Sequence, residues 1–249
     1  MLDGHGPQYG PGTETAEWHT PGGHLVRMTY RRDTTDWNTV SACLRNPMGA
    51  TWDSGDEYHL PRGLAGWALD LGAHIGAVTI GLLMDNPDLR VLAIEAVPEN
   101  AELVRTNLAL NGLTDRATVW HAAGWSKSGE MTVEYDYSGD EVAFGHRYIG
   151  SVSPWIADAP RTYVKVRSVT LKDALKVTDG QGFVWVKTDC EGCEHPFFTG
   201  PGLKQLGVIE GEWHTRDGSP ESFAARLSKT HVVEWGQGIG GGPFKAVPK

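Results

Sequence analysis

Acidic side chains and a histidine gather around the ends of two apolar runs in the second half of the chain. Asp189 ends the run Phe183–Asp189, Glu191 lies two residues beyond it, and His214 follows the run Leu206–Glu212. Short apolar runs are typical of buried parallel strands, whose carboxyl ends meet at one edge of a sheet. We therefore expect these side chains to lie close together at that edge.

Proton removal is the chemistry that these residue types support. A histidine with an unperturbed pKa of about 6.5 suits a general base near neutral pH. A carboxyl group such as that of Asp189 can act in the same way if burial raises its pKa. We predict His214, Asp189 and Glu191 as catalytic residues that take a proton from a bound acceptor. A structural interpretation stays open. In it, His214 is a structural histidine whose hydrogen bonds are satisfied within the protein, and Glu191 and Glu194 cap the following turn or pair with a basic residue.

The same segment also contains groups that bind metals. Ligands suited to a hard divalent cation are present in Asp189, Glu191, Glu212 and His214. Cys190, Cys193 and His195 resemble half a zinc site, and the two cysteines could instead form a redox pair. A structural zinc site usually has four protein ligands, and the third cysteine lies far away at position 43. We adopt the interpretation without a metal and keep these alternatives open.

A glycine turn in the first half of the chain indicates a nucleoside site. Residues 70–76 read Asp-Leu-Gly-Ala-His-Ile-Gly and follow a short apolar run. Gly72 and Gly76 have no Cβ, so a ligand can approach the backbone closely. The spacing differs from the Gly-x-Gly-x-x-Gly of dinucleotide sites, because His74 stands where the middle glycine would make room for a pyrophosphate. The turn therefore disfavours a dinucleotide.

Two acids beside this turn favour a cationic nucleoside. Asp70 directly precedes the first glycine and can meet a sulfonium or ammonium group. Glu95 ends the next apolar run, 19 residues after Gly76, where it can accept hydrogen bonds from ribose hydroxyls. We predict S-adenosylmethionine as the cofactor, with Asp70, Gly72, His74, Gly76 and Glu95 in contact with it.

The elements that must position these residues alternate along the chain. Expected strands cover residues 24–30, 67–71, 90–95, 117–121, 130–135, 163–169, 183–189, 206–212, 231–235 and 244–247. Expected helices cover 37–44, 77–83, 98–110, 171–175 and 220–228. Alternating strands and helices predict an α/β fold with helices on both faces of a parallel sheet. We expect a doubly wound, mainly parallel sheet of seven strands with an antiparallel hairpin at the C-terminus.

Composition and periodicity along the chain also indicate the domain organisation. We expect residues 1–62 to form an N-terminal extension that covers the site, with residues 1–23 as a loose tail because they are rich in Gly, Pro, Thr and His and lack periodicity. Residues 63–249 form the main domain. Its segment 136–161 is long, glycine-rich and aromatic, which is typical of an active-site loop.

Composition limits the partners. The 249 residues contain 22 Lys and Arg against 31 Asp and Glu, a net charge of −9, which disfavours nucleic acid as a partner. Three cysteines are too few for a disulfide scaffold. The sequence has no leader-like segment and no apolar run long enough to span a membrane. We expect a soluble, cytoplasmic protein with reduced cysteines and no membrane partner, and we leave its oligomeric state open, a homodimer being one option.

Taken together, these motifs resemble the FkbM-type methyltransferases. The similarity runs from about residue 53 to 215 and is carried by segments 70–76, 95–100, 107–112, 122–126, 186–194 and 210–214. It implies a class I, Rossmann-like methyltransferase fold and S-adenosylmethionine as methyl donor. It also extends the expected cofactor-binding set to Ala73, Ala96, Asn100, Ala122, Ala123 and Asp189. The chain departs from the family pattern at His74, Ala96, Cys190 and Cys193.

The resemblance further implies O-methylation of a hydroxyl on a sugar or another natural product, so the expected partner is a small-molecule or glycan acceptor. N-methylation of an amine or peptide is the alternative among enzymes. An S-adenosylmethionine-binding protein without catalytic activity is the alternative from another class.

Overall fold

The structure is a computed structural model in which residues 12–32, 34–44, 60–136, 142–143, 146–147, 161–214, 219–236 and 241–249 are described. The main strands are β3 (Gly66–Leu71), β4 (Leu89–Glu95), β5 (Ala117–Gly124), β6 (Gly129–Asp136), β9 (Arg161–Val169), β10 (Phe183–Thr188), β11 (Leu206–His214), β12 (His231–Trp235) and β13 (Gly241–Pro248). Within the described residues, these nine strands form one sheet in the order β12-β13-β11-β10-β3-β4-β5-β9-β6.

The sheet is mixed. Strands β11, β10, β3, β4, β5 and β9 pair in parallel from one to the next. β6 runs antiparallel to β9, and β13 runs antiparallel to both β11 and β12. The prediction of seven strands is therefore wrong, since the described sheet has nine and two of them run against the rest. Local patterns predict strands one at a time, whereas the set that joins one sheet is decided by long-range pairing.

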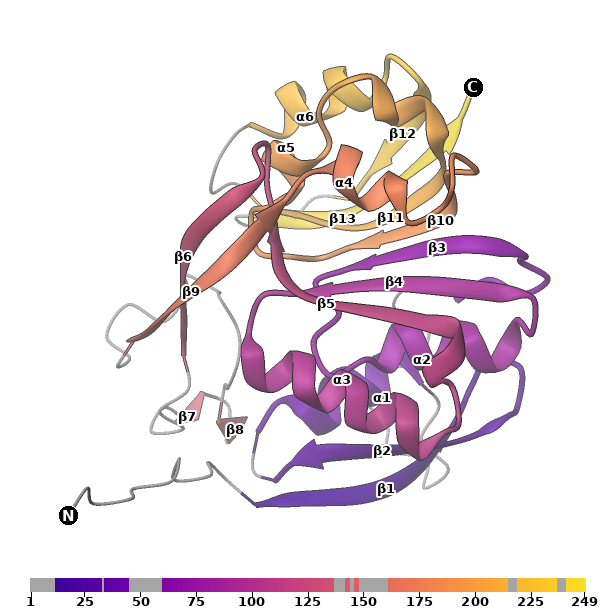
Figure 1. The fold of residues 1–249 in the computed structure, drawn as a ribbon, viewed down its shortest axis with the longest axis vertical. Helices are drawn as coiled ribbons and strands as arrows, with labels where there is room; N and C mark the ends of the chain where they lie inside the picture. Colours follow the sequence, from indigo (N-terminus) through magenta and orange to yellow (C-terminus); the bar gives the residue numbers. More distant parts are fainter. Residues whose placement is uncertain are drawn as a thin grey trace.

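Helices cover both faces of this sheet, as expected. Helices α1 (Asp36–Cys43), α2 (Ala77–Asp85) and α3 (Pro98–Leu110) lie on one face, and α4 (Leu171–Lys176), α5 (Glu194–Phe197) and α6 (Pro220–Leu227) lie on the other (Figure 1). The inner strands contribute side chains to the hydrophobic cores on both faces of the sheet, because alternate side chains point to opposite faces. On β3, Ala68 belongs to the core under α2, whereas Leu69 and Leu71 belong to the core on the opposite side.

An N-terminal hairpin forms a further layer outside α2 and α3 (Figure 1). Strands β1 (Thr13–His19) and β2 (Leu25–Arg31) pair antiparallel, so the prediction of a loose tail over residues 1–23 is wrong where β1 lies. Asn107 of α3 holds the hairpin by accepting the Thr29 N–H at 2.6 Å and donating to the Thr29 carbonyl at 3.0 Å. The hairpin explains why α2 is buried along its whole first two turns, since it is covered on both sides.

The short elements complete the description. They are the 3₁₀ turns η1 (Thr114–Arg116) and η2 (Pro201–Gln205) and the two-residue strands β7 (Val142–Ala143) and β8 (His146–Arg147). β7 and β8 pair with one another inside the segment predicted as an active-site loop. Most of that segment lies outside the described residues, so its predicted role stays a prediction.

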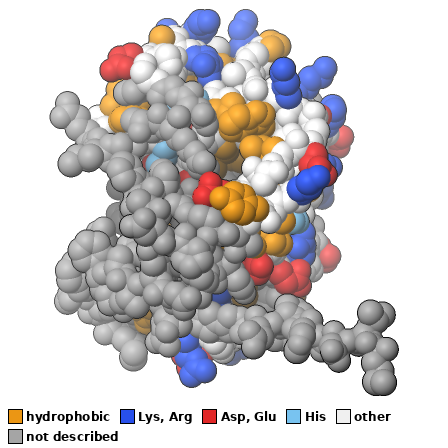
Figure 2. All heavy atoms as spheres, turned by 90° about the vertical axis from the view of Figure 1, so that its left-hand side faces the viewer, with side chains coloured by type: hydrophobic (Ala, Val, Ile, Leu, Met, Phe, Trp, Pro, Cys, Tyr) orange, Lys and Arg blue, Asp and Glu red, His pale blue; other side chains and the backbone are white. Residues whose placement is uncertain are grey.

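Two properties of the described surface bear on partners. No helix among the described residues is long and apolar enough to cross a membrane. On the described part of the face in Figure 2, acidic and basic side chains are intermixed.

Trp18 offers a test of whether the hairpin is an integral part of the fold. Its side chain is fully buried, and its Nε1 donates to the Ser41 hydroxyl at 3.1 Å. We expect Trp18→Ala to lower the free energy of unfolding by about 3–5 kcal/mol in denaturant titrations, because it leaves a large cavity. Leu25→Ala in the same hairpin, where the side chain is 44% exposed, should change it by less than about 0.5 kcal/mol. Equal and small effects of both changes would show that the hairpin is not part of the cooperative unit.

Candidate active site

A pocket of about 700 Å³ opens at the carboxyl ends of the central strands. The turn after β3, the end of β4, the end of β5 and the loop after β10 form most of its wall, with further residues from α1 and β6. Nine of the residues predicted to bind the cofactor line it, namely Gly72, Ala73, His74, Glu95, Ala96, Asn100, Ala122, Ala123 and Asp189. Glu191 lines it too, whereas Asp70, Gly76 and His214 lie outside the wall that the described residues form.

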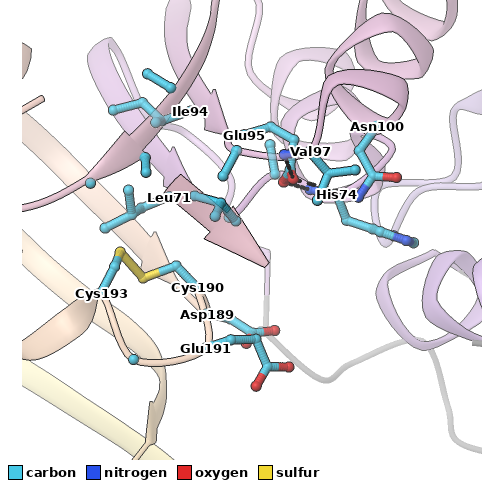
Figure 3. Close-up of a pocket in the computed structure, with 18 of the residues that line it drawn as sticks. Leu71, His74, Ile94, Glu95, Val97, Asn100, Asp189, Cys190, Glu191 and Cys193 are labelled. Carbon is cyan, nitrogen blue, oxygen red and sulfur yellow. Dashed lines mark hydrogen bonds between the residues drawn. A yellow bond between two sulfur atoms is a disulfide. The ribbon is translucent and has the colours of Figure 1, made fainter. Parts of the chain in front are cut away.

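Glu95 lies at the end of β4 with its carboxylate held in place by backbone groups. One oxygen accepts the His74 N–H at 2.8 Å, and the other accepts the Val97 N–H at 2.9 Å (Figure 3). The side chain is only 6% exposed, and burial raises the pKa of Glu95 against the lowering effect of these bonds and of His74. Each carboxylate oxygen keeps a lone pair that is free of these backbone bonds, so Glu95 remains suited to accept hydrogen bonds from the hydroxyl groups of a ligand.

Asp70 has charged and polar partners within the protein. Its carboxylate is fully buried, accepts the Thr79 hydroxyl at 2.6 Å and lies 3.6 Å from the Lys187 ammonium. Lys187 in turn donates to the carbonyl of Gly72. Asp70 lies outside the pocket wall that the described residues form, and its predicted contact with a cationic ligand stays a prediction. It balances the charge of a buried lysine that holds the glycine turn, and only the fold brings β3 and β10 side by side to make this pair.

Packing requires a glycine at position 72, whereas backbone conformation favours one at position 76. Gly72 has φ +80°, and a Cβ on it would lie 1.9 Å from the carbonyl oxygen of Asp189. Gly76 has φ +96° at the start of α2, and a Cβ there would contact Val104 of α3 at 3.4 Å. The sequence predicts that both glycines let a ligand approach the backbone closely. In the structure, the protein backbone itself takes that space at Gly72, which fixes the turn against the loop after β10.

A buried ionic network that the sequence did not reveal supports the turn from the N-terminal side. Arg31 of β2 makes two bonds of 2.8 Å to the carboxylate of Asp36, and one of its nitrogens also donates to Asn100 at 2.8 Å. Asp36 lies 3.1 Å from His74 Nε2. Burial would raise the pKa of Asp36, but His74 and Arg31 hold it well below its usual range. Arg31 and Asp36 look like ordinary surface charges in the sequence, since nothing local indicates that both are buried.

His214 lies behind the pocket wall in a cluster of carboxylates. Its Nδ1 lies 3.1 Å from Glu194, and its Nε2 lies 3.4 Å from Glu191 and 3.8 Å from Glu212. Glu194 is fully buried and also accepts the backbone N–H groups of Cys190 and Gly192, each at 2.9 Å. Glu194 therefore stabilises the loop as well as the imidazole, in agreement with the structural interpretation that the sequence left open.

The protonation states differ from those expected. Burial would lower the pKa of His214, but the hydrogen bond to Glu194 and the charges of Glu194, Glu191 and Asp189 raise it to about 9. A raised pKa favours the protonated imidazole near neutral pH, which is unfavourable for a general base, and the predicted role of His214 stays a prediction. Burial and the neighbouring acids raise the pKa of Glu191 to about 7 despite the lowering effect of His214.

The prediction of reduced cysteines is wrong for two of the three, Cys190 and Cys193. Cys190 and Cys193 form a disulfide across the loop after β10 (Figure 3). Cys43 lies on α1, where it lines another part of the pocket wall. Figure 3 shows Asp189 and Glu191 beside this disulfide, projecting to the same side of the loop. Two cysteines three residues apart allow a disulfide in sequence, but only the backbone path of the loop decides whether the sulfur atoms meet.

Ligand atoms of Asp189, Glu212 and His214 all lie within 4.8 Å of one another. This grouping is compatible with the divalent-cation alternative, in which His214 would have to be neutral to coordinate.

Comparison with known proteins gives the following similarities. A family model described as "Methyltransferase FkbM domain" matches residues 70–229. The precorrin-6y C5,15-methyltransferase of Geobacter metallireducens GS-15 is similar with a TM-score of 0.41 and 14% identity, over 74% of this chain and 81% of that chain. An O-methyltransferase from Bacillus cereus in complex with SAH is similar with a TM-score of 0.42 and 17% identity, over 74% of each chain. No curated protein sequence matches significantly. Structural likeness at this level does not identify a substrate.

The ionic network predicts a large stability effect at Asp36. Asp36→Asn removes one partner of a buried pair, so we expect the free energy of unfolding to fall by about 3 kcal/mol at pH 7. Because the folded pKa of Asp36 is depressed, its contribution is present above the unfolded pKa of about 4 and is lost as the pH falls further. The difference between the two proteins should therefore shrink on acidification.

Glu17→Gln provides the matched control, since Glu17 pairs with Arg27 at a surface where the two side chains are 50% and 57% exposed. Its effect on denaturant unfolding should stay below about 1 kcal/mol. An Asp36 variant as stable as the Glu17 variant would contradict the network.

Proposed function

The chain belongs to the FkbM methyltransferase family and is an S-adenosylmethionine-dependent methyltransferase, and from this premise we propose that it methylates a hydroxyl group of a small molecule with Glu191 as the general base. The family model matches residues 70–229, which is more than half of the chain. The observation that carries the proposal is a carboxyl group with a pKa of about 7 in the wall of the pocket.

The chemistry of the pocket fits the cofactor. Glu95 offers lone pairs suited to two ribose hydroxyls, and its backbone bonds fix the direction in which they point. His74 Nδ1 is buried in the pocket wall with no hydrogen-bond partner among the described residues, so it has a bond to offer to a polar ligand. Asp189 lines the pocket opposite this group and carries a negative charge suited to a cationic ligand. When bound, S-adenosylmethionine supplies a methyl group already activated on a sulfonium.

Glu191 is the residue of the cluster best suited to remove a proton. A general base works best when its pKa is close to the working pH, and burial with neighbouring acids raises the pKa of Glu191 to about 7. Its side chain faces the pocket, whereas His214 lies behind it. This assignment revises the sequence-based choice of His214 as base, because an imidazolium has no lone pair with which to accept a proton.

His214 then acts as a positioning residue. Its positive charge lowers the pKa of Glu191, which would otherwise rise further through burial and repulsion from Asp189, Glu194 and Glu212. Its second nitrogen is held by Glu194, which fixes the ring against the loop. Asp189 remains a candidate for orienting the acceptor, because it lines the pocket next to Glu191.

The acceptor is a small molecule or the reactive end of a glycan. A pocket of about 700 Å³ lies in the usual range for small-molecule sites, about 300–1,000 Å³. A hydroxyl must lose its proton as it attacks a methyl group, which gives a carboxylate base its purpose. A sugar or another natural product meets these requirements, and FkbM-type enzymes commonly use such acceptors. N-methylation of an amine or peptide is the alternative that the same base would also serve.

The cofactor assignment predicts a binding defect at Glu95. We expect Glu95→Ala to weaken the binding of S-adenosylhomocysteine by at least about tenfold in titration calorimetry, because a hydrogen bond to a charged group contributes about 1.5–3 kcal/mol. Glu102→Gln on α3, where the side chain is 72% exposed, should bind like the unaltered protein. Unchanged binding by the Glu95 variant would remove Glu95 from the cofactor site.

The base assignment predicts a characteristic pH profile. In the unaltered enzyme, kcat/KM should rise as the pH increases to about 7, where Glu191 loses its proton, and then level off. We expect Glu191→Gln to lower kcat by about 10²–10⁴-fold and to abolish this rise, while S-adenosylhomocysteine still binds. His214→Asn should move the rise to higher pH, because removing the positive charge raises the pKa of Glu191. A Glu191→Gln enzyme with the same profile as the parent would exclude Glu191 as base.

The acceptor class requires a separate experiment. Incubation with radiolabelled S-adenosylmethionine and separate pools of glycans, hydroxylated small molecules, amines and peptides should place the label in the first two pools. Label found only with amines or peptides favours N-methylation, and no label with any pool despite cofactor binding favours the non-catalytic alternative. Activity lost with EDTA and restored by Mg²⁺ would favour a cation bound by Asp189, Glu212 and His214.

A further inference from the structure

The disulfide lies in the loop after β10, which connects the Glu95 side of the pocket with the acid cluster. Cys190 and Cys193 are joined, and every residue from Asp189 to Cys193 lines the pocket. Cys190 is partly exposed towards the pocket, whereas Cys193 is only 9% exposed. A molecule in the pocket therefore lies against the disulfide.

The loop inside this cross-link has a constrained backbone. Glu191 adopts a left-handed conformation with φ +57°, which is unfavourable for a residue with a side chain. Two anchors oppose relaxation, namely the disulfide itself and the Glu194 carboxylate, which binds the backbone N–H groups of Cys190 and Gly192. Opening the disulfide removes one of these anchors from the segment that carries Asp189 and Glu191.

We propose that Cys190–Cys193 is a reversible thiol–disulfide exchange site, and that its oxidised form holds the pocket in the state that binds the cofactor. The inference rests on the proposed function for the identity of the pocket ligand. The co-reactant is a low-molecular-weight dithiol or its cyclic disulfide, small enough to reach a sulfur atom in the pocket wall.

The exchange transfers two electrons. One thiolate of the dithiol attacks Cys190 Sγ, forming a mixed disulfide and breaking the Cys190–Cys193 bond, and Cys193 leaves as a thiolate that takes a proton from solvent. The second thiol of the reagent loses its proton and attacks the first sulfur of the reagent, which is bonded to Cys190 Sγ in the mixed disulfide. Cys190 leaves as a thiolate that takes a proton from solvent, and the reagent leaves as a cyclic disulfide. The protein gains two thiol groups and the dithiol is oxidised, and the reverse reaction closes the loop.

The coupling between ligand binding and reduction of the disulfide must be reciprocal. If the oxidised chain binds S-adenosylhomocysteine about tenfold more tightly than the reduced chain, the ligand must protect the disulfide from reduction by the same factor. For a two-electron couple, a tenfold factor lowers the midpoint potential of the disulfide by about 30 mV. The disulfide would then report on cofactor occupancy, and cofactor occupancy would depend on redox state.

The test uses the intact chain in two redox states. Protein purified without reductant, alkylated after denaturation and weighed by mass spectrometry should carry one alkyl group, on Cys43, whereas protein treated with dithiothreitol should carry three. Titration calorimetry with S-adenosylhomocysteine should give binding about tenfold weaker for the reduced protein. Equilibration in dithiothreitol buffers of graded ratio should show that saturating S-adenosylhomocysteine lowers the midpoint potential.

Variants separate the exchange site from general effects of thiols. The double variant Cys190→Ser/Cys193→Ser should bind like the reduced protein and should not respond to the redox buffer, whereas Cys43→Ser should keep the response. Equal binding in both redox states would overturn the inference and leave the proposed function intact. Three alkyl groups without prior reduction would overturn it as well. Binding in neither state would contradict the proposed function, and with it the coupling.

Discussion

The contact between the turn after β3 and the loop after β10 is the constraint on which the rest of the site depends. The Asp189 N–H donates to the carbonyl of Leu71 at 3.1 Å, and the backbone carbonyl of Asp189 occupies the space where a Cβ of Gly72 would lie. Lys187 binds the Gly72 carbonyl from beneath, with its charge balanced by Asp70. This contact joins the Glu95 side of the pocket to the acid cluster, so both parts keep one geometry.

Charge balance in the acid cluster sets its chemistry. Four carboxylates gather around one imidazole, and burying so much negative charge is unfavourable unless cations or protons compensate it. The imidazolium of His214 provides part of that compensation, and the raised pKa of Glu191 provides another part by keeping a proton available near neutral pH. A structural requirement, the cost of burying acids, thus produces a group suited to proton transfer.

The N-terminal hairpin contributes to the same site from the opposite side. Asp36 connects Arg31 of β2 with His74 of the turn, and the N–H of His74 holds Glu95. α1 also supplies part of the pocket wall. The position of the carboxylate proposed to bind ribose therefore depends on residues that are far from it in sequence. The family model begins at residue 70, so this support lies outside the segment that it matches.

The sequence by itself determined the alternation of strands and helices from β3 onwards, the glycine turn, the acid that ends β4 and the acidic loop, because these depend on local periodicity and on spacing within short segments. It also indicated the family, since its motifs occur together in order. Only the tertiary structure decided the charge states and the pairings. The pKa of His214 is raised and Asp70 pairs with Lys187 because of neighbours that β10, β11 and β3 bring together, and the backbone path of the loop after β10 joins Cys190 to Cys193. A pKa or a buried ion pair depends on burial and on distant charges, which no local pattern records.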